Sequence, residues 1–403
     1  MRISNSLTES EYMQCVEQAL YQLETWIERE SFQGWDPYDA LNSPLLKRMT
    51  FRSRFFGIAW VQLLKRSPLN MRPLLRVPKG YNPKGMGLFM SSYLRKYQLT
   101  GDPKALDRVR FFAEWLYKNI SPGYSGACWG YNFDWPNRGF FAPAGTPTAV
   151  NTAFIASAFL DLYELPSSPC LEASDTPLGI ARSACDFILR DLNRLEPSPY
   201  ELCFSCTPLD HRWVHNANIL GALLLARVYK YTEEETLARH AIASARFTAA
   251  RQRSDGTWPY GEGKQDTWVD NFHTGFVLVA LKQIAQYLDT KKFDRVLDRG
   301  YRFWKQHMFL PEGTPKYYPD RVYPIDIHNV AQAVLTFLEF ADLDPEAREW
   351  AWRVARWSIE HMQDPKGYFH YQIHRHYRIR IPYMRWSQAW MFLALIHLDS
   401  ELD

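Results

Sequence analysis

The stretch DTWVDNFHTGFVLVAL (residues 266–281) begins with polar and aromatic residues and ends as an apolar run. Its first half holds an acid, an amide and an imidazole, at Asp270, Asn271 and His273. Its second half has the apolar character of a helix that is buried on all sides. The same order, a polar start followed by an apolar helix, recurs along the chain, and this repeat decides the fold.

Apolar runs with helical spacing begin near residues 84, 148, 213, 268, 326 and 385. Charged amphipathic helices alternate with these runs. They are predicted over roughly 102–120, 174–193, 233–252, 290–309 and 344–363, with two further candidates at 9–29 and 47–66. The simplest closed arrangement is an inner ring of six helices wrapped by an outer ring. The sequence therefore predicts an all-α (α/α)6 toroid, with up to one N-terminal helix left over.

No linker divides the chain, so residues 1–403 are predicted to form a single domain, with 1–46 as an N-terminal helix and lead-in. The connections are unequal in length. Those from an inner helix to the next outer helix are short, whereas those from an outer helix to the next inner helix are long. All long loops must then lie on the face that carries the N-termini of the inner helices. This face is predicted to hold the functional site.

Two of the long loops share the spacing Q-x-x-x-G-x-aromatic. One runs from Gln252 through Gly256 to Trp258, and the other from Gln363 through Gly367 to Phe369. We interpret the Gln and Gly positions as turn chemistry, with the aromatic side chain plugging the space between neighbouring hairpins.

The composition excludes some classes of partner. The net charge is +3 without a run of basic residues, so no nucleic-acid partner is expected. The aromatic content is high, with 15 Trp, 23 Tyr and 24 Phe, and flat aromatic faces stack well on sugar rings. The N-terminus has no apolar signal-peptide region and no stretch reaches ~18 apolar residues. Neither a signal peptide nor a transmembrane helix is expected, and the predicted location is the cytoplasm.

The six cysteines are scattered and require no disulfide. Cys203 and Cys206 form a C-x-x-C pair, but no second pair lies nearby, so the signal for zinc or redox chemistry is weak. No metal and no cofactor are expected.

Aligning the inner helices on their first amide gives one column. It contains Asn151, Asn216, Asn271, Asn329 and Gln388. Helix capping explains such a column. The neighbouring columns vary and bring in titratable or aromatic groups. They contain His215, Asp270 and His328 one position earlier, His273 two positions later, and Trp268, Asp326 and Arg385 three positions earlier. Gathered at one end of a ring, these side chains are expected to converge on a catalytic pocket.

Five motifs resemble a known family. They are NPKGMGLF, GYSGACWGYNFDW, TPTAVNTAF, WPYGEG…WVDNFHTGFVL and IPYMRWSQAWMF. They are similar to a family found in glycan and polysaccharide biosynthesis loci, whose members are often labelled delta-aminolevulinic acid dehydratases. That label does not suit this chain, because the porphyrin enzyme is a TIM barrel with lysine Schiff-base chemistry.

The resemblance runs from about residue 75 to the C-terminus. More broadly, the pattern is similar to six-hairpin glycosidases, uronate lyases and uronyl C5-epimerases, which share the (α/α)6 scaffold. This resemblance implies carbohydrate chemistry on a glycan or a lipid-linked oligosaccharide. Because fold-level analogy does not give the reaction, several functions remain open.

The first hypothesis is removal of H5 from a uronic acid, by a C5-epimerase or a lyase. The carboxylate must be neutralised by donors, for which the candidates are Asn216, Asn271, His273 and Arg385. A base and an acid must face the sugar, for which the candidates are His215, His328, Tyr131 and Tyr383. Asp270 acts as an acid or orients His273 or His215. Trp129, Trp258 and Trp268 would stack on sugars, and Asn151 would complete the binding set.

The second hypothesis is a glycoside hydrolase, which needs two carboxyl groups about 5–5.5 Å or ~6.5–9.5 Å apart. Its candidates are Asp134, Asp270 and Asp326. A third hypothesis, a terpenoid-type cyclase, lacks the D-x-D-D acid motif. A fourth, a non-catalytic glycan-binding protein, would keep the aromatic residues but would not need His215, Asp270 and His328 together.

Overall fold

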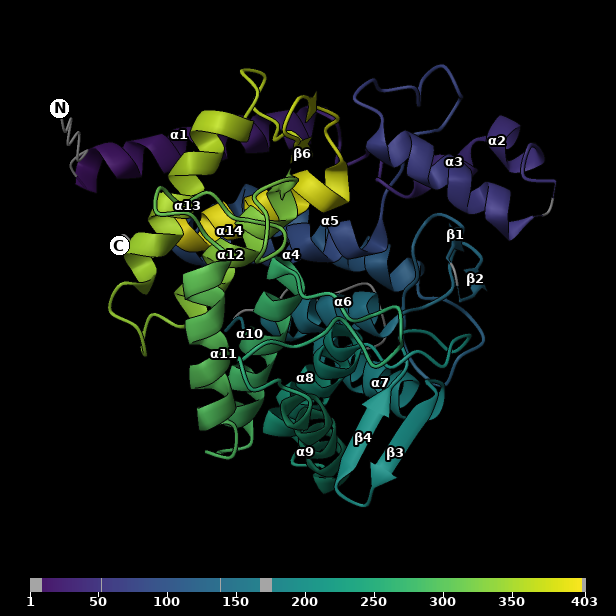
Figure 1. The fold of residues 1–403 in the computed structure, drawn as a ribbon, viewed down its shortest axis with the longest axis vertical. Helices are drawn as coiled ribbons and strands as arrows, with labels where there is room; N and C mark the ends of the chain where they lie inside the picture. Colours follow the sequence, from purple (N-terminus) through teal and green to yellow (C-terminus); the bar gives the residue numbers. More distant parts are fainter. Residues whose placement is uncertain (1–8, 52, 138, 167–175, 401–403) are drawn as a thin grey trace.

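The computed structural model describes residues 9–51, 53–137, 139–166 and 176–400. Six apolar helices form an inner ring (Figure 1): α4 (Pro83–Thr100), α6 (Ala149–Tyr163), α8 (His215–Thr232), α10 (Asn271–Tyr287), α12 (Ile327–Glu339) and α14 (Trp390–Asp399). Each packs on the next, and α14 packs on α4, so the ring is closed. The outer helices are α1 (Glu9–Arg29), α5 (Pro103–Lys118), α7 (Pro177–Arg190), α9 (Glu235–Ala250), α11 (Asp294–His307) and α13 (Ala347–Met362). The predicted (α/α)6 toroid is confirmed.

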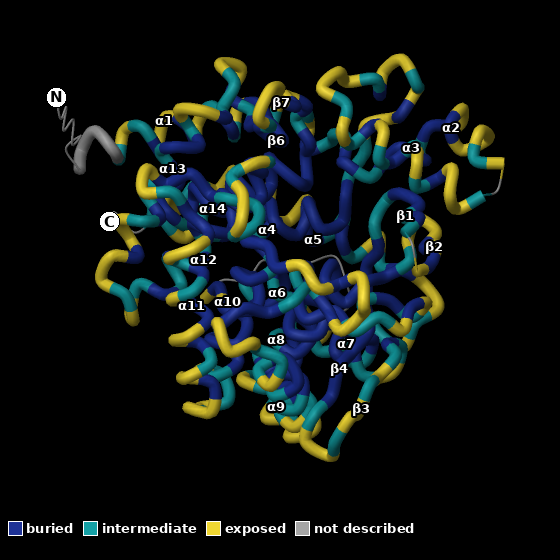
Figure 2. The backbone as a smooth tube through the Cα atoms, viewed as in Figure 1, coloured by how far each residue is buried: buried dark blue, intermediate teal, exposed yellow. Residues whose placement is uncertain are grey.

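The burial pattern explains why the two rings differ in sequence. Most residues of the inner helices are buried, so these helices are apolar almost all round (Figure 2). The outer helices bury one face only. In α11 the buried residues are Leu297, Gly300, Tyr301 and Trp304, at the spacing of one helical stripe, and the remaining faces are charged.

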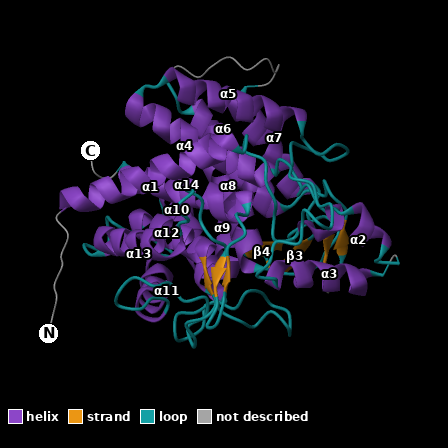
Figure 3. Ribbon diagram, turned by 90° about the horizontal axis from the view of Figure 1, so that it is seen from above, coloured by secondary structure: helices purple, strands orange, loops and turns teal. Residues whose placement is uncertain are grey.

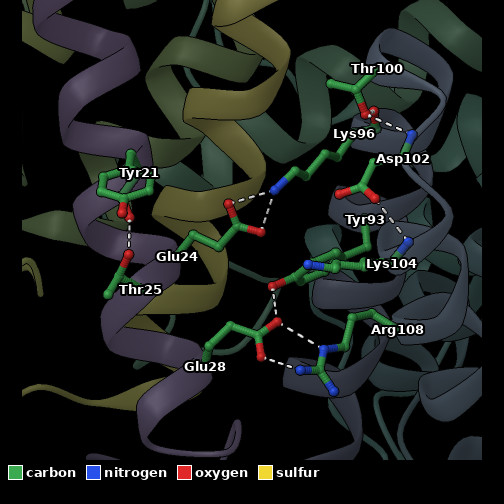
Figure 4. A network of polar contacts seen from close by, with 10 residues as sticks. All are labelled: Tyr21, Glu24, Thr25, Glu28, Tyr93, Lys96, Thr100, Asp102, Lys104 and Arg108. Atoms are coloured by element: carbon green, nitrogen blue, oxygen red, sulfur yellow. Dashed lines mark hydrogen bonds and ion pairs between the residues drawn. The ribbon is translucent and has the colours of Figure 1, made fainter.

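The N-terminal helix α1 closes the outer ring. It packs on α13 and α14, and its acidic side chains reach the first hairpin (Figure 4). Glu24 accepts two hydrogen bonds from Lys96 Nζ, at 2.6 and 2.7 Å. Glu28 accepts one from the Tyr93 hydroxyl at 2.8 Å and pairs with Arg108. Residues 9–29, one of the two candidate helices ahead of the first inner helix, are therefore the sixth outer helix.

The surplus helix is the predicted segment 47–66, and it is broken in two. It forms α2 (Pro44–Arg48) and α3 (Arg54–Arg66), which stand beside the ring rather than in it (Figure 1). A short 3-10 helix, η1 (Asp39–Asn42), precedes them. These elements enclose a small apolar cluster of their own, separate from the main core.

The long loops lie at the N-terminal ends of the inner helices, as predicted. They carry three small antiparallel sheets, and Figure 3 shows many of these loops gathered on the side that holds the strands. The sheets are β1 (Trp135–Pro136) with β2 (Phe141–Ala142), β3 (Arg194–Ser198) with β4 (Glu201–Phe204), and β5 (Ile325–Asp326) with β6 (Gln372–Ile373) and β7 (Arg378–Ile379). In the last sheet Asp326 faces Gln372, which fixes the start of α12.

The shared Q-x-x-x-G spacing joins neighbouring hairpins. Gln252 Nε2 donates to Gly256 O at 3.2 Å and to Val296 O of α11 at 2.9 Å. Gln363 Nε2 donates to Gly367 O at 3.0 Å and to Ala19 O of α1 at 2.9 Å. Each Gln thus ties its own loop to the next outer helix. The turn-chemistry interpretation of these positions agrees with the contacts.

Gly367 is expected to be the least replaceable glycine of this set. Its φ is +101°, and an added Cβ would lie 2.2 Å from Gln22 O in α1. We expect Gly367→Ala to lower the free energy of unfolding by about 3 kcal/mol or more, measured by urea denaturation. The matched control is Gly101→Ala, where φ is +65° but no atom lies within 4 Å of the Cβ. Equal losses for both variants would contradict the proposed close approach.

Candidate active site

A cavity of about 290 Å³ lies at the N-terminal end of the inner ring. All six hairpins contribute to it. The lining residues at the starts of the inner helices are Lys84 (α4), Val150 (α6), Asn216 (α8), His273 (α10), His328 (α12) and Arg385, which lies in the π-helical turn η2 (Met384–Ala389) before α14. Aromatic residues of the long loops complete the wall: Tyr131, Phe133, Trp135, Tyr260, Trp268 and Tyr317. The cavity is thus polar at the helix ends and aromatic along the loops.

Asp270 holds His273 in one orientation. Asp270 is the N-cap of α10, and its Oδ1 accepts the His273 backbone N–H at 3.0 Å. Its Oδ2 lies 2.7 Å from His273 Nδ1 and accepts the Trp268 indole N–H at 3.1 Å. Because a carboxylate only accepts, Nδ1 of His273 carries a proton, so in the neutral imidazole the lone pair is on Nε2. Tyr260 stacks on Trp268 with ring centroids 4.4 Å apart and contacts His273 edge-on.

His328 is the second imidazole of the cavity, on the neighbouring inner helix. Both of its ring nitrogens are buried, and neither finds a hydrogen-bond partner among the described residues. Burial, together with the nearby charges of Lys84 and Arg385, lowers the pKa of His328 well below its usual range. His328 is therefore neutral at neutral pH, and its N–H is free to donate to a ligand.

The two cations of the cavity differ in their partners. Arg385 is buried and forms a bidentate pair with Asp36, at 2.6 and 2.9 Å. Lys84 Nζ lies over the rings of Phe154, Trp390 and Phe276, at 4.3, 5.0 and 5.7 Å from their centroids. In the described part of the chain, the Lys84 ammonium makes neither a hydrogen bond nor an ion pair, although the Lys84 backbone N–H donates to Asn82 Oδ1 at 3.1 Å.

The ionisation of Lys84 is set by opposing effects. Burial and the neighbouring Arg385 lower the pKa of Lys84 well below its usual value. Three aromatic faces around an ammonium favour its charged form. When charged, Lys84 is a cation in the cavity wall whose charge no carboxylate of the described residues offsets by direct contact. The arrangement can accept an anionic group.

Seven of the predicted site residues line this cavity. They are Tyr131, Asn216, Trp268, Asp270, His273, His328 and Arg385. Eight others do not line it. They are Trp129, Asp134, Asn151, His215, Trp258, Asn271, Asp326 and Tyr383.

Four of these eight are titratable and occupy other contacts. His215 Nε2 lies 3.0 Å from Glu262 Oε1. Asp134 pairs with Lys47 at 2.8 Å, beside α2. Asp326 caps α12 and accepts from Gln372 and Trp386, and burial raises its pKa. Tyr383 packs edge-on against Tyr371.

Three of the other four serve the scaffold. Trp129 and Trp258 are buried and donate their indole N–H groups to Leu116 O and Thr248 O. Asn271 accepts from Trp304 Nε1 at 2.8 Å and donates to backbone carbonyls of the next loop. The side-chain amide of Asn151, the fourth residue, is buried and finds no hydrogen-bond partner among the described residues.

The capping interpretation of the amide column is wrong. Side-chain caps come from the residues before it: Thr148 caps α6, Asp270 caps α10 and Asp326 caps α12. The amides stand inside the helices, where Asn271 and Gln388 bind the backbone of the long loops. Capping therefore explains the two acids, and loop anchoring explains part of the amide column.

Sequence reasoning missed Lys84, Asp36 and Tyr317. Lys84 had a visible signal, since it is a lysine in the first turn of a helix whose first half, PKGMGLFM, is otherwise apolar. The alignment of inner helices left out this first helix. Asp36 is 349 residues from Arg385 in the chain, so no local pattern could pair them.

Disulfides, clusters of metal ligands and membrane-spanning helices are absent from the described residues. The five cysteines in the described part, Cys203 and Cys206 among them, are free thiols, and Cys170 lies outside the described residues. Within the described ranges no cluster of three His, Cys, Asp or Glu side chains is placed to hold a metal ion. No helix in the same ranges combines the length and the apolar character that crossing a bilayer requires.

The fold is that of known carbohydrate-active enzymes. No family model and no curated protein match the chain. Among solved structures, it is similar to cellobiose 2-epimerase from Bacillus thermoamylovorans, with a TM-score of 0.61, 10% identity, and coverage of 80% of this chain and 90% of that chain. It is also similar to a D-mannose isomerase (TM-score 0.60, 11% identity, 79% and 87% covered) and to an unsaturated glucuronyl hydrolase specific for heparin (TM-score 0.60, 11% identity, 97% of both). The structural similarity establishes the shared toroid. At sequence identities this low it does not identify the reaction.

Proposed function

We propose that this chain is a carbohydrate epimerase or lyase that removes the proton next to the carboxylate of a uronic acid. The observation that carries the proposal is the Asp270–His273 pair, which leaves Nε2 of His273 as a base in an aromatic-walled cavity. The names of the similar structures, which include sugar epimerases and isomerases, agree with proton transfer on a sugar.

His273 is the proposed base. As it takes up the proton, it becomes an imidazolium, which the carboxylate of Asp270 stabilises at 2.7 Å. The role of Asp270 is then to orient and stabilise His273 rather than to act on the sugar. An imidazole base placed in this way contributes ~10²–10⁴-fold to a proton-transfer step.

The negative charge that develops on the substrate needs donors in the cavity wall. Helix α4 lies opposite α10 in the closed ring, and Lys84 reaches inward from it, with Nζ 5.7 Å from the ring centroid of Phe276 on α10. We propose that Lys84 binds the sugar carboxylate and that neutral His328 donates a hydrogen bond to the same group. A neutral imidazole is a suitable donor here because it adds no second cation beside Lys84.

The proton must return on the opposite face if the product is the C5 epimer. Tyr131 is the proposed acid. It lies under Arg385, whose guanidinium carbon is 5.1 Å from the ring centroid, and burial keeps the pKa of Tyr131 above its usual range. If the C4 substituent leaves before the proton returns, the same carbanion gives an unsaturated sugar and the chain is a lyase.

A hydrolase built on two of the predicted acids receives less support. Among the described residues, Asp270 is the carboxylate that lines the cavity, whereas Asp134 and Asp326 lie outside it. Hydrolysis with a carboxylate pair requires both groups at the same sugar bond. The hydrolase remains the second candidate because the similar structures include a glucuronyl hydrolase.

The products formed from uronate-containing oligosaccharides separate these reactions. We expect purified protein to yield a C5 epimer or a 4,5-unsaturated sugar, identified by NMR, with the glycan otherwise intact. Release of a reducing end without either product would move the assignment to a hydrolase. A panel of neutral oligosaccharides of the same length is the control, and turnover of the neutral panel alone would contradict the carboxylate requirement.

A further inference from the structure

Residues 44–66, PLLKRMTFRSRFFGIAWVQLLKR, carry a charge pattern that the net charge of +3 conceals. This segment contains six Lys or Arg residues and no Asp or Glu. The absence of acid extends further, because no Asp or Glu occurs between Ala40 and Gly101. The expectation of a chain without a run of basic residues therefore does not hold for this region.

The same segment turns large apolar side chains outward. Phe51 is 78% exposed, Phe55 73% and Leu63 58%. Phe55 and Leu63 are two helical turns apart on one face of α3, with the exposed Ala59 between them. Leu45 in α2 and Met49, the C-cap of α2, are further exposed apolar side chains of this segment. Phe56 stacks edge-on against Phe51 and Phe55. We call these side chains, Leu45, Met49, Phe51, Phe55, Phe56 and Leu63, the α2–α3 surface.

Basic groups flank the α2–α3 surface. Arg48, Arg54 and Arg66 are exposed, and none of them makes an ion pair in the described part of the chain. A small separate core beneath the surface, which includes Leu41, Leu46 and Val61, holds α2 and α3 in place. The surface is therefore a fixed apolar patch within a basic region. It is not a frayed end.

We propose that the α2–α3 surface docks the protein on an anionic lipid bilayer. The Phe and Leu side chains would enter the boundary between headgroups and acyl chains, and the Arg side chains would pair with lipid phosphates. Helices of this kind, apolar on one face and basic around it, bind the membrane interface without crossing it.

Other partners fit this surface less well. In a symmetric dimer the surface would meet its own copy, and the basic groups would face one another across the two-fold axis. A nucleic acid would pair with the arginines but would leave the Phe and Leu side chains in water. A bilayer satisfies both the charge and the apolar area.

Docking at this surface would bring the catalytic cavity close to the membrane. Strand β1 packs on α3, and the loop that contains β1 lines both the catalytic cavity and a cleft beside α3. Asp134 and Pro136 line a cleft of about 640 Å³ beside α2 and α3, whereas Phe133 and Trp135 line the catalytic cavity. A sugar attached to a lipid would be within reach of a protein bound in this way. The docking itself does not depend on which reaction the cavity performs.

The test is flotation of the full chain with lipid vesicles. We expect the protein to float with vesicles of phosphatidylcholine and phosphatidylglycerol, to bind vesicles of phosphatidylcholine alone much more weakly, and to detach as salt is raised. Arg48→Gln with Arg54→Gln should weaken binding about fivefold per charge. Phe51→Ser with Phe55→Ser should weaken binding at least about tenfold.

The control is Tyr200→Ser with Leu343→Ser. Tyr200 and Leu343 are 69% and 65% exposed and lie outside the α2–α3 surface. The control should bind like the unmodified protein, and circular dichroism should show all variants folded. Failure to float with anionic vesicles would overturn the proposal. So would wild-type binding by the Phe51→Ser, Phe55→Ser variant, or light scattering that shows a dimer dispersed by these two substitutions.

Discussion

His273→Ala is expected to lower kcat for the proposed proton transfer by ~10²–10⁴-fold while the protein stays folded. The reason is geometric. His273 Nδ1 is held by Asp270 at 2.7 Å, so the opposite nitrogen is fixed as the base, and no other described side chain of the cavity has this arrangement. The measurement is the initial rate of product formation on a uronate oligosaccharide, with KM determined separately.

The matched control is His361→Ala. His361 lies on the outer helix α13, stacked on Trp357 and away from the cavity, so its loss should leave kcat unchanged. Asp270→Asn provides a second comparison, because Asn also caps helices well but carries no charge. It should lower kcat less than His273→Ala and leave the melting temperature nearly unchanged. Full activity of His273→Ala would contradict the assignment of the base.

Lys84→Met is expected to stabilise the fold and to disable the site. Lys84 is buried and has no carboxylate partner in the described part of the chain, so a methionine of similar length removes the free-energy cost of taking an ionisable amine out of water. We expect a gain of about 1–4 kcal/mol in the free energy of unfolding at neutral pH. We also expect kcat/KM for a uronate to fall by a factor of about 30 or more, because the carboxylate loses its cation.

The gain should depend on pH in a defined direction. The pKa of Lys84 is lowered in the folded protein, so between the folded value and the ordinary value near 10.5 the unfolded chain binds more protons. Lys84 therefore opposes folding most below its folded pKa, and this effect disappears as the pH rises through 10.5. Denaturation of both proteins across this range should show the Lys84→Met advantage shrinking as the pH rises.

Lys282→Met is the control for Lys84→Met. Lys282 is also buried, but it pairs with Asp342 at 2.8 Å and with Glu339 at 3.4 Å. Its replacement should destabilise the protein by about 1–3 kcal/mol and leave the cavity untouched. If both variants change stability in the same direction, the distinction between a paired and an unpaired buried lysine fails.

The ring could be predicted from the sequence because the pattern that produces it occurs six times along the chain. Six apolar helices alternate with amphipathic ones, and the helix starts fell within about five residues of the structure. The role of α1 could not be predicted in the same way. Its place in the outer ring depends on contacts between distant parts of the chain. Its apolar stripe joins the main core, and Glu24 and Glu28 pair with Lys96 and Arg108, which are 72 and 80 residues away.

The candidate site was only partly predictable, because the repeat gives the position of a residue along its helix but not the direction of its side chain. The columns of the inner helices located Asp270, His273, His328 and Arg385, because equivalent positions in a repeat share one end of the ring. The same columns could not say which side chains turn into the cavity. His215 occupies the column of Asp270 but lies against Glu262, outside the lining.

Deuterium exchange at the carbon next to the carboxylate tests the central proposal most directly. The protein would be incubated in D2O with uronate oligosaccharides, and the H5 signal followed by NMR, with His273→Ala in parallel. We expect the H5 signal to disappear with the unmodified protein and to persist with the variant. Turnover of the same substrates without any deuterium at C5, in the product or in recovered substrate, would contradict proton abstraction and would leave the cavity as the site of another carbohydrate reaction.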